Sequence, residues 1–231
     1  MTNECVVAID VSPTHAYLSV VFRDGRDPMY SVVRFPSVDE ALDTNTTRMV
    51  EIARRNSELV SAKLGKLPAP PTLVVMSKLF LFDMKHDPSG ARRAGLWWEV
   101  AQRVLDLRGS TDDYRLCEVA PMSAQRVVTG RSVPGKQGFA DTERGLRALY
   151  PTLAERLPSD YRWYVLGEAL TAAVALGWST PLTVTNSSLS AMRGRVNSFP
   201  VDVPKTVDDW KQKNAEHKAV YRSTTPKEKI A

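Results

Sequence analysis

The sequence predicts an α/β protein with a mixed five-stranded sheet, three antiparallel strands followed by parallel strands, flanked by helices. Three observations support this class. Three strand-like runs open the chain, and the last two are joined by a loop with Asp24-Gly25 that suits a hairpin. Two further strand-like runs follow, and each is succeeded by a helical pattern, which is typical of parallel pairing. The opening runs are residues 6–11, 15–22 and 29–35.

The middle of the chain supplies a helix and a central strand. Ser37 and Glu40 form a capping box that predicts a long polar helix ending near Gly65. The prolines of LPAPPT exclude helix, and the following TLVVMSKLFLF is apolar on both strand faces. Such a strand belongs in the middle of a covered sheet.

The second half continues with alternating elements. Asp87-Pro88 predicts the start of a helix, because Asp caps and proline suits the first turn. A strongly apolar helix within YRWYVLGEALTAAVALGW should stop at Gly177. The expected elements between them are a helix at 89–107, a strand at 115–120, a short helix at 122–128, a basic glycine-containing loop at 130–138 and a helix at 142–149.

Composition indicates a cytoplasmic protein without membrane contact. The chain has 231 residues, 43% of them hydrophobic, which is enough for a sizeable core. Cys5 and Cys117 lie in separate strand-like runs, so we expect reduced core thiols rather than a bridge or a metal pair. No segment has the pattern of a signal peptide or the roughly 18 apolar residues of a membrane span.

Charge divides the chain into two predicted units, a main domain at 1–180 and a basic C-terminal arm at 181–231. Residues 191–231 hold nine Lys or Arg against five Asp or Glu, whereas the whole chain has a net charge of only +5. NSSLS and two prolines predict an extended arm, with a short helix from a Thr206–Asp209 capping box to about Tyr221. This helix should dock on its own domain, on a second copy or on another protein. The basic charge suits nucleic acid or a merely solvated tail.

The order of several motifs resembles the RuvC-like Holliday-junction resolvases of the ribonuclease-H-like superfamily, over roughly residues 5–178. VVAIDVS resembles the first strand with its metal-binding aspartate, and VVMSKLFLFDMKHDPSGARRAGLWWEV resembles the fourth strand and following helix. EVAPMSAQRVVTGRSVPGKQ resembles the segment that ends in a lysine, and GEALTAAVAL the last helix. The resemblance implies a ribonuclease-H-like fold, a homodimer, and branched or duplex DNA as partner.

The family's chemistry implies about four carboxylates that hold two Mg²⁺ ions, one activating water and one stabilising the leaving oxygen. The resemblance assigns Asp10 and Glu168 as the catalytic and metal-binding acids. It places Ser77 and Val165 where the other two acids should be, and neither is a good metal ligand. The acidic site is therefore degenerate, and two carboxylates balance only half of the charge of two Mg²⁺ ions.

Other acids could extend this set. Asp83, just past the fourth strand, is a candidate for a displaced ligand, although six residues separate it from Ser77 along the chain. Glu99 and Asp141 are poorer candidates.

Both assigned acids also have structural interpretations. Asp10 could bond backbone groups of the turn at Ser12 to Thr14. Glu168 is the only charged residue from Trp163 to Trp178, so it should stay protonated or pair with a lysine or arginine.

The predicted basic loop and a tryptophan pair offer nucleic-acid contacts. The resemblance places Arg126, Arg131 and Lys136 near the DNA, where they could bind phosphates, although such loops are also simply soluble. Trp97 and Trp98 are better read as one core anchor and one partly exposed neighbour than as a base-stacking platform.

Three functional hypotheses follow. The leading one is a RuvC-like protein with an impaired metal site, a pseudo-nuclease that binds nucleic acid or a protein assembly without efficient cleavage. The second is an active Mg²⁺-dependent, structure-specific endodeoxyribonuclease. The third is a structural protein of a viral particle that uses the arm for contacts. A phage-encoded protein, in the host cytoplasm or associated with the virion, would fit this sequence.

Overall fold

Five strands form one mixed sheet in the order β3-β2-β1-β4-β5. In this computed structural model the described residues are 4–37, 46–68, 71–79, 89–106 and 115–224. β1, β2 and β3 pair antiparallel, whereas β4 pairs parallel with both β1 and β5. The strands are β1 Cys5–Val11, β2 His15–Phe22, β3 Met29–Arg34, β4 Pro71–Ser77 and β5 Arg115–Val119.

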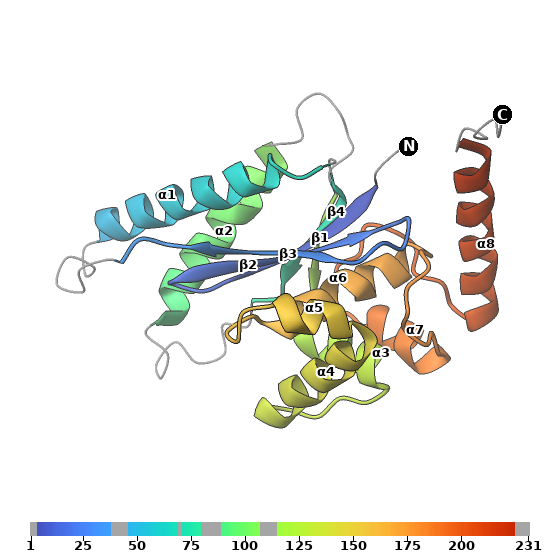
Figure 1. Cartoon of the computed structure of the whole chain (residues 1–231). Coiled ribbons are helices and arrows are strands. Elements are labelled where there is room, and N and C mark those ends of the chain that lie inside the picture. Colours follow the sequence, from blue (N-terminus) through green and yellow to red (C-terminus); the bar gives the residue numbers. More distant parts are fainter. Residues whose placement is uncertain (1–3, 38–45, 69–70, 80–88, 107–114, 225–231) are drawn as a thin grey trace.

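Helices cover both faces of the sheet (Figure 1). α1 and α2 pack together on one face, and α6 crosses the other face over β1, β2 and β4. α3 and α4 pack outside α6, so that this side has two helical layers. The helices are α1 Thr46–Leu64, α2 Ser89–Asp106, α3 Pro121–Thr129, α4 Lys136–Leu149, α5 Pro151–Arg156, α6 Trp163–Ala175, α7 Asn186–Met192 and α8 Val207–Thr224.

Strand periodicity divides the core into two clusters. Side chains alternate between the faces of a strand, so Cys5, Val7 and Ile9 join the cluster beneath α1 and α2. Val6 and Ala8 join the cluster around α6. By the same alternation, the even-numbered residues of β1 are those that face α6.

The C-terminal helix α8 docks on its own chain, at the end of α6. The indole nitrogen of Trp210 donates to the carbonyl of Val174 at 3.0 Å, and Lys213 Nζ donates to the carbonyl of Ala175 at 3.2 Å. Asn214 Nδ2 donates to the carbonyl of Gly177 at 2.8 Å. Lys213 and Asn214 satisfy carbonyls that the helix end leaves without backbone partners, whereas Trp210 adds a second donor to the Val174 carbonyl, which also accepts from the amide of Gly177. The ammonium of Lys213 complements the negative end of the helix dipole.

Part of the predicted arm is helical instead of extended. NSSLS begins α7, because Thr185 and Ser188 form a reciprocal capping box and Leu189 is buried. Residues 193–206 lack regular secondary structure, as predicted for this stretch, and they run along β5. There Ser198 exchanges hydrogen bonds with both backbone groups of Glu118, and the side chain of Asn197 accepts from the amide of Ala120. The segment thus covers the edge of the sheet.

The remaining elements agree closely with the sequence predictions, with four differences. β4 ends at Ser77, whereas the strand predicted from TLVVMSKLFLF continued through Lys78 and Leu79. α4 begins at Lys136 instead of residue 142, which shortens the predicted loop, and α5 was not predicted. The helix at the C-terminus continues beyond Tyr221 to Thr224. The helix starts predicted at Glu40 and at Asp87-Pro88 lie outside the described residues. Cys5 and Cys117 are buried thiols that form no disulfide with each other, as expected. Within the described residues, no helix has the length and apolarity needed to cross a membrane.

Candidate functional site

The carboxyl ends of β1 and β4 place Asp10 and Ser77 beside each other. The parallel register pairs Ile9 with Met76, so the residues that follow them lie at the same edge of the sheet. Both side chains face α6, since Asp10 follows the even positions of β1 and Ser77 continues the alternation of Leu73 and Val75. α6 brings Glu168 to the same place. The structure therefore brings together Asp10, Ser77 and Glu168, as the resemblance implied.

The carboxylate of Asp10 pairs with a cation from its own chain. Arg162 Nη1 lies 2.5 Å from Asp10 Oδ2, and the hydroxyl of Tyr164 donates to the same oxygen at 2.7 Å. The guanidinium carbon of Arg162 also lies 4.9 Å from the ring centroid of Tyr17, which pairs with Asp10 across β1 and β2. Burial lowers the pKa of Arg162, but the charges of Asp10 and Tyr164 and the hydrogen bonds to both together outweigh burial, so the net pKa is raised.

The alternative interpretation of Asp10 as a turn residue is wrong. The turn after β1 is closed by Ser12, whose hydroxyl donates to the carbonyl of His15 and accepts from its amide. The hydrogen bonds of the Asp10 carboxylate within the described residues run to Arg162 and Tyr164 instead.

Glu168 is fully buried and takes no cation among the described residues. Its Oε2 accepts a 2.5 Å hydrogen bond from the hydroxyl of Ser77, and its Oε1 has no hydrogen-bond partner within the part of the chain that is described. Burial raises the pKa of Glu168 well above its usual range; the bond from Ser77 opposes this, and the charge of Asp10 adds to it. Burial therefore favours the protonated form of the carboxyl group, the direction of one of the two outcomes that the sequence predicted.

Sequence reasoning missed Arg162 and the role of Tyr164. Arg162 precedes the first residue of α6, and Tyr164 is the only residue of that helix that is not buried. The signal was present, because Arg162 is the charged residue nearest to the apolar helix. Sequence analysis sought a cation for Glu168, whereas the arginine pairs with Asp10.

The donor groups do not fit a site for two Mg²⁺ ions. The carboxylate of Asp10 is already paired with Arg162, burial favours the neutral form of Glu168, and Val165 is a buried apolar residue. Among the described residues, no group of three His, Cys, Asp or Glu side chains could hold a metal ion. Asp83 lies outside the described residues.

The two poorer acidic candidates do not join the site. Glu99 belongs to α2, which covers the opposite face of the sheet from α6. Asp141 lies on α4, where arginine side chains neutralise it.

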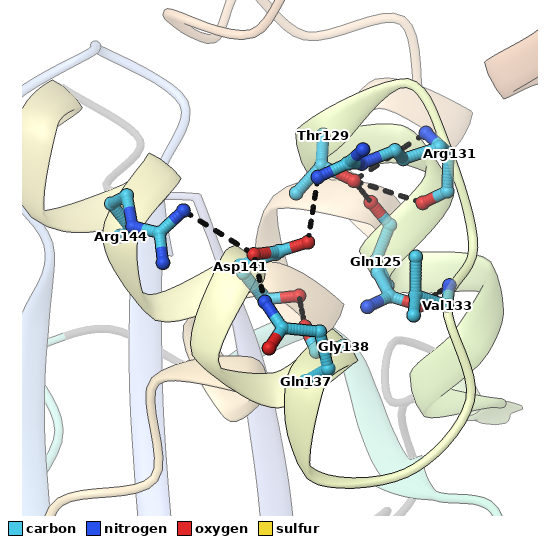
Figure 2. A network of polar contacts seen from close by, with 9 residues as sticks. Gln125, Thr129, Arg131, Val133, Gln137, Gly138, Asp141 and Arg144 are labelled. Carbon is cyan, nitrogen blue, oxygen red and sulfur yellow. Dashed lines mark hydrogen bonds and ion pairs between the residues drawn. The ribbon is translucent and has the colours of Figure 1, made fainter.

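A polar network fixes the loop between α3 and α4 (Figure 2). Asp141 is almost fully buried, and it pairs with Arg131 at 2.9 Å and with Arg144 at 3.4 Å. Gln125 Oε1 accepts from the amide of Val133 at 2.8 Å. A Cβ on Gly138 would lie less than 3.0 Å from both the Val133 carbonyl and the Gln125 side chain. These contacts thus hold the predicted basic loop in one conformation, and glycine at 138 permits the close approach of α4 to Val133 and Gln125.

The three predicted phosphate-binding residues differ in their availability. Arg131 is largely exposed, but it is committed to Asp141. Arg126 on α3 and Lys136 at the start of α4 are exposed and have no carboxylate partner within the described residues. Within the described residues, these two side chains are the cations of α3 and α4 that have no carboxylate partner.

The tryptophan pair follows the sequence prediction. Trp97 is half-buried, and its indole nitrogen donates to the carbonyl of Ser77 at 2.9 Å. Trp98 is 58% exposed. Trp97 therefore anchors α2 to the strand that carries Ser77.

The strand order and the parallel β1-β4-β5 ladder define a ribonuclease-H-like fold. Neither a protein-family model nor a curated protein sequence matches this chain. One similar solved structure is described as T. thermophilus RuvC in complex with a Holliday junction substrate. It is 17% identical over 74% of this chain and 92% of that chain, with a TM-score of 0.49. A second is the ethanolamine utilization protein EutJ from Carboxydothermus hydrogenoformans, 11% identical over 74% of this chain and 68% of that chain, with a TM-score of 0.29. The fold assignment rests on this chain's own topology.

Proposed function

We propose that this chain is a RuvC-like, non-catalytic protein that binds nucleic acid. The observation that carries the proposal is the internal neutralisation of its two assigned acids. Arg162 lies 2.5 Å from Asp10, and the fully buried Glu168 shares a hydrogen bond with Ser77. Metal-dependent phosphodiester cleavage needs ionised oxygens that are free to bind hard cations. Neither acid meets that requirement in this arrangement.

A single guanidinium is a poor substitute for the missing chemistry. It neutralises one negative charge and can hold Asp10 in place, but its pKa is too high for it to activate a water molecule as a base. Asp10, Arg162 and Tyr164 thus form a structural unit at the position where the resemblance implies a metal site. Such a unit supports the fold and leaves the surface around it available for binding.

The nucleic-acid contact that we propose lies on α3 and α4. Arg126 and Lys136 are exposed without carboxylate partners in the described residues, and Arg131 keeps most of its side chain in solvent. The rigid loop between the helices fixes these cations relative to each other. A polyanion gains affinity from such a surface by releasing bound counterions, so the affinity should fall steeply with salt.

The test incubates the purified protein with labelled four-way-junction and duplex DNA in Mg²⁺ or Mn²⁺, scoring binding and cleavage together. The variants are Asp10→Asn and the double reversal Arg126→Glu/Lys136→Glu. A matched control is Arg54→Glu/Lys63→Glu, whose side chains are exposed on α1 at the opposite face. We expect salt-sensitive binding without cleavage, weakened by the first pair of reversals and not by the control.

Two results would overturn the proposal. Cleavage that disappears in Asp10→Asn would establish an active Mg²⁺-dependent endonuclease. Absence of binding to either DNA at low salt would remove the nucleic-acid function altogether.

A homodimer and a cytoplasmic location belong to this proposal. An assembly role drew its support from a free C-terminal arm, and the contacts of α8 with α6 tie that helix to its own chain.

A further inference from the structure

An exposed aromatic side chain lies beside the free cations of α3 and α4. Large hydrophobic side chains are exposed at eight described positions, and only Trp98 and Phe139 among them are aromatic. Phe139 is 46% exposed, and its ring centroid lies 5.0 Å from that of Tyr164. Lys136 precedes Phe139 by three residues on α4, so both belong to one helix face.

The neighbouring helix contributes a second apolar and cationic pair. Met122 is 51% exposed and lines the same shallow hollow as Phe139. Arg126 follows Met122 by four residues on α3, so these two also share a face. The result is a small surface, here called the Phe139 platform, formed by Met122, Arg126, Lys136 and Phe139.

The platform is held rigidly. The hydroxyl of Tyr164 donates to Asp10 and accepts from Arg162, which fixes the ring against which Phe139 packs. The close approach at Gly138 fixes the first turn of α4. A preorganised ring loses little conformational entropy when a flat ligand stacks on it.

From this arrangement we infer that the Phe139 platform binds an unpaired base of single-stranded nucleic acid, with Arg126 and Lys136 on the adjoining phosphates. This inference rests on the proposed nucleic-acid function and names its substrate class. Two apolar side chains make a patch too small for a stable protein interface, and uncompensated cations favour a polyanion. Paired bases hide their faces within the duplex, so only an unpaired base can stack on the ring.

The experiment measures fluorescence anisotropy of labelled oligothymidine and of a duplex of equal length, with wild type, Phe139→Ala and Phe139→Trp. Because stacking contributes roughly 1–3 kcal/mol per base, Phe139→Ala should bind the single strand about 5- to 150-fold more weakly. Duplex affinity should stay unchanged, and Phe139→Trp should restore single-strand binding. Trp98→Ala is the matched control, because it removes the other exposed aromatic side chain from the far face of the sheet.

The outcomes separate this inference from the proposed function. Lys136→Ala should weaken binding to both oligonucleotides and reduce the salt dependence. Suppose that Lys136→Ala has this effect, but that Phe139→Ala either binds the single strand like wild type or weakens binding to the single strand and the duplex equally. The proposed role of the Phe139 platform is then overturned, and the nucleic-acid function stands. If wild type binds neither oligonucleotide, both are overturned. Thermal unfolding of each variant verifies that the exposed substitutions leave the fold intact.

Discussion

The hydroxyl of Ser77 donates a 2.5 Å hydrogen bond to Oε2 of Glu168, joining the end of β4 to the middle of α6. Every residue of α6 except Tyr164 is buried, so Glu168 has no access to water. One hydrogen bond cannot replace the hydration of a carboxylate, and the proton stays on the acid. The stability of the fold is therefore linked to the protonation of this one group.

Stability should fall as the pH rises above the ordinary carboxyl pKa, because the pKa of Glu168 is raised in the folded protein. Below about pH 4.5 both states hold the proton. Above it the unfolded chain ionises first, which favours unfolding by about 1.4 kcal/mol per pH unit until the folded pKa is reached. Urea unfolding from pH 5 to 8 should therefore show that the free energy of unfolding falls less steeply with pH in Glu168→Gln than in wild type. An equal pH dependence in the two proteins would contradict the raised pKa of Glu168. Glu143→Gln is the control, because Glu143 forms a surface pair with Arg147 and its replacement should leave the pH dependence unchanged.

Asp10 and Arg162 should be energetically coupled. Each single variant, Asp10→Asn or Arg162→Ala, leaves a partly buried charge without its partner, so each should lower the free energy of unfolding by about 1–3 kcal/mol. The double variant should cost about 1–3 kcal/mol less than the sum of the single variants. Chemical denaturation of wild type and the three variants gives the double-mutant cycle. If the changes in the free energy of unfolding are additive, the pair is energetically unimportant. The exposed pair Asp208 and Lys211 serves as a control, with a coupling of roughly 0–0.5 kcal/mol.

Gly138→Ala should be strongly destabilising, whereas Gly95→Ala should not. The added methyl group at 138 collides with the Val133 carbonyl and with Gln125, which requires a shift of the loop at a cost of about 1–3 kcal/mol. Nothing lies within 4 Å of a Cβ at Gly95 in helix α2, so alanine there should stabilise by roughly 0.5–1 kcal/mol. Differential scanning calorimetry should show midpoints that move in opposite directions. Two shifts of the same sign would argue against the close approach.

Removing one cap of α6 should weaken the docking of α8. Asn214 is buried, and its amide donates to the carbonyl of Gly177 at 2.8 Å. Asn214→Ala leaves that carbonyl without its partner and should lower the free energy of unfolding by about 1–3 kcal/mol. Gln212→Ala, two residues earlier on the exposed side of α8, should change it by about 0.5 kcal/mol or less. Equal effects of the two variants in urea denaturation would show that α8 contributes little.

Local signals predicted most of the fold. Strand-like runs and the Asp24-Gly25 loop placed the opening strands, and β4, which is apolar on both faces at its centre, was correctly expected in the sheet interior. The start of α4 was missed because glycines at 135 and 138 read as loop residues, although Gly138 is required by tertiary packing. NSSLS was read as extended because its polar residues suit turns, and its helix depends on a capping box and on the burial of Leu189.

The sequence predicted which residues meet at the site, but not which of them form ion pairs and hydrogen bonds with each other. The strand and helix positions of Asp10 and Glu168 brought both to one edge of the sheet, as the resemblance implied. The partner of Asp10 could not be derived, since the Arg162 contact spans 152 residues and depends on how α6 lies across the sheet. For Glu168 the sequence left two outcomes open, a retained proton or a cationic partner, because no other charge occurs along its helix. The raised pKa and the absence of a cation among the described residues favour the first.

The caps that α8 places on α6 also impose an order on biosynthesis. The carbonyl of Val174 meets its indole partner only after the ribosome has added 36 further residues. Until then the carbonyls of Ala175 and Gly177, which accept from Lys213 and Asn214 in the folded protein, must take their hydrogen bonds from water. A ribosome that stalls before Trp210 therefore leaves a chain in which the carboxyl end of α6 lacks every side-chain cap that α8 supplies.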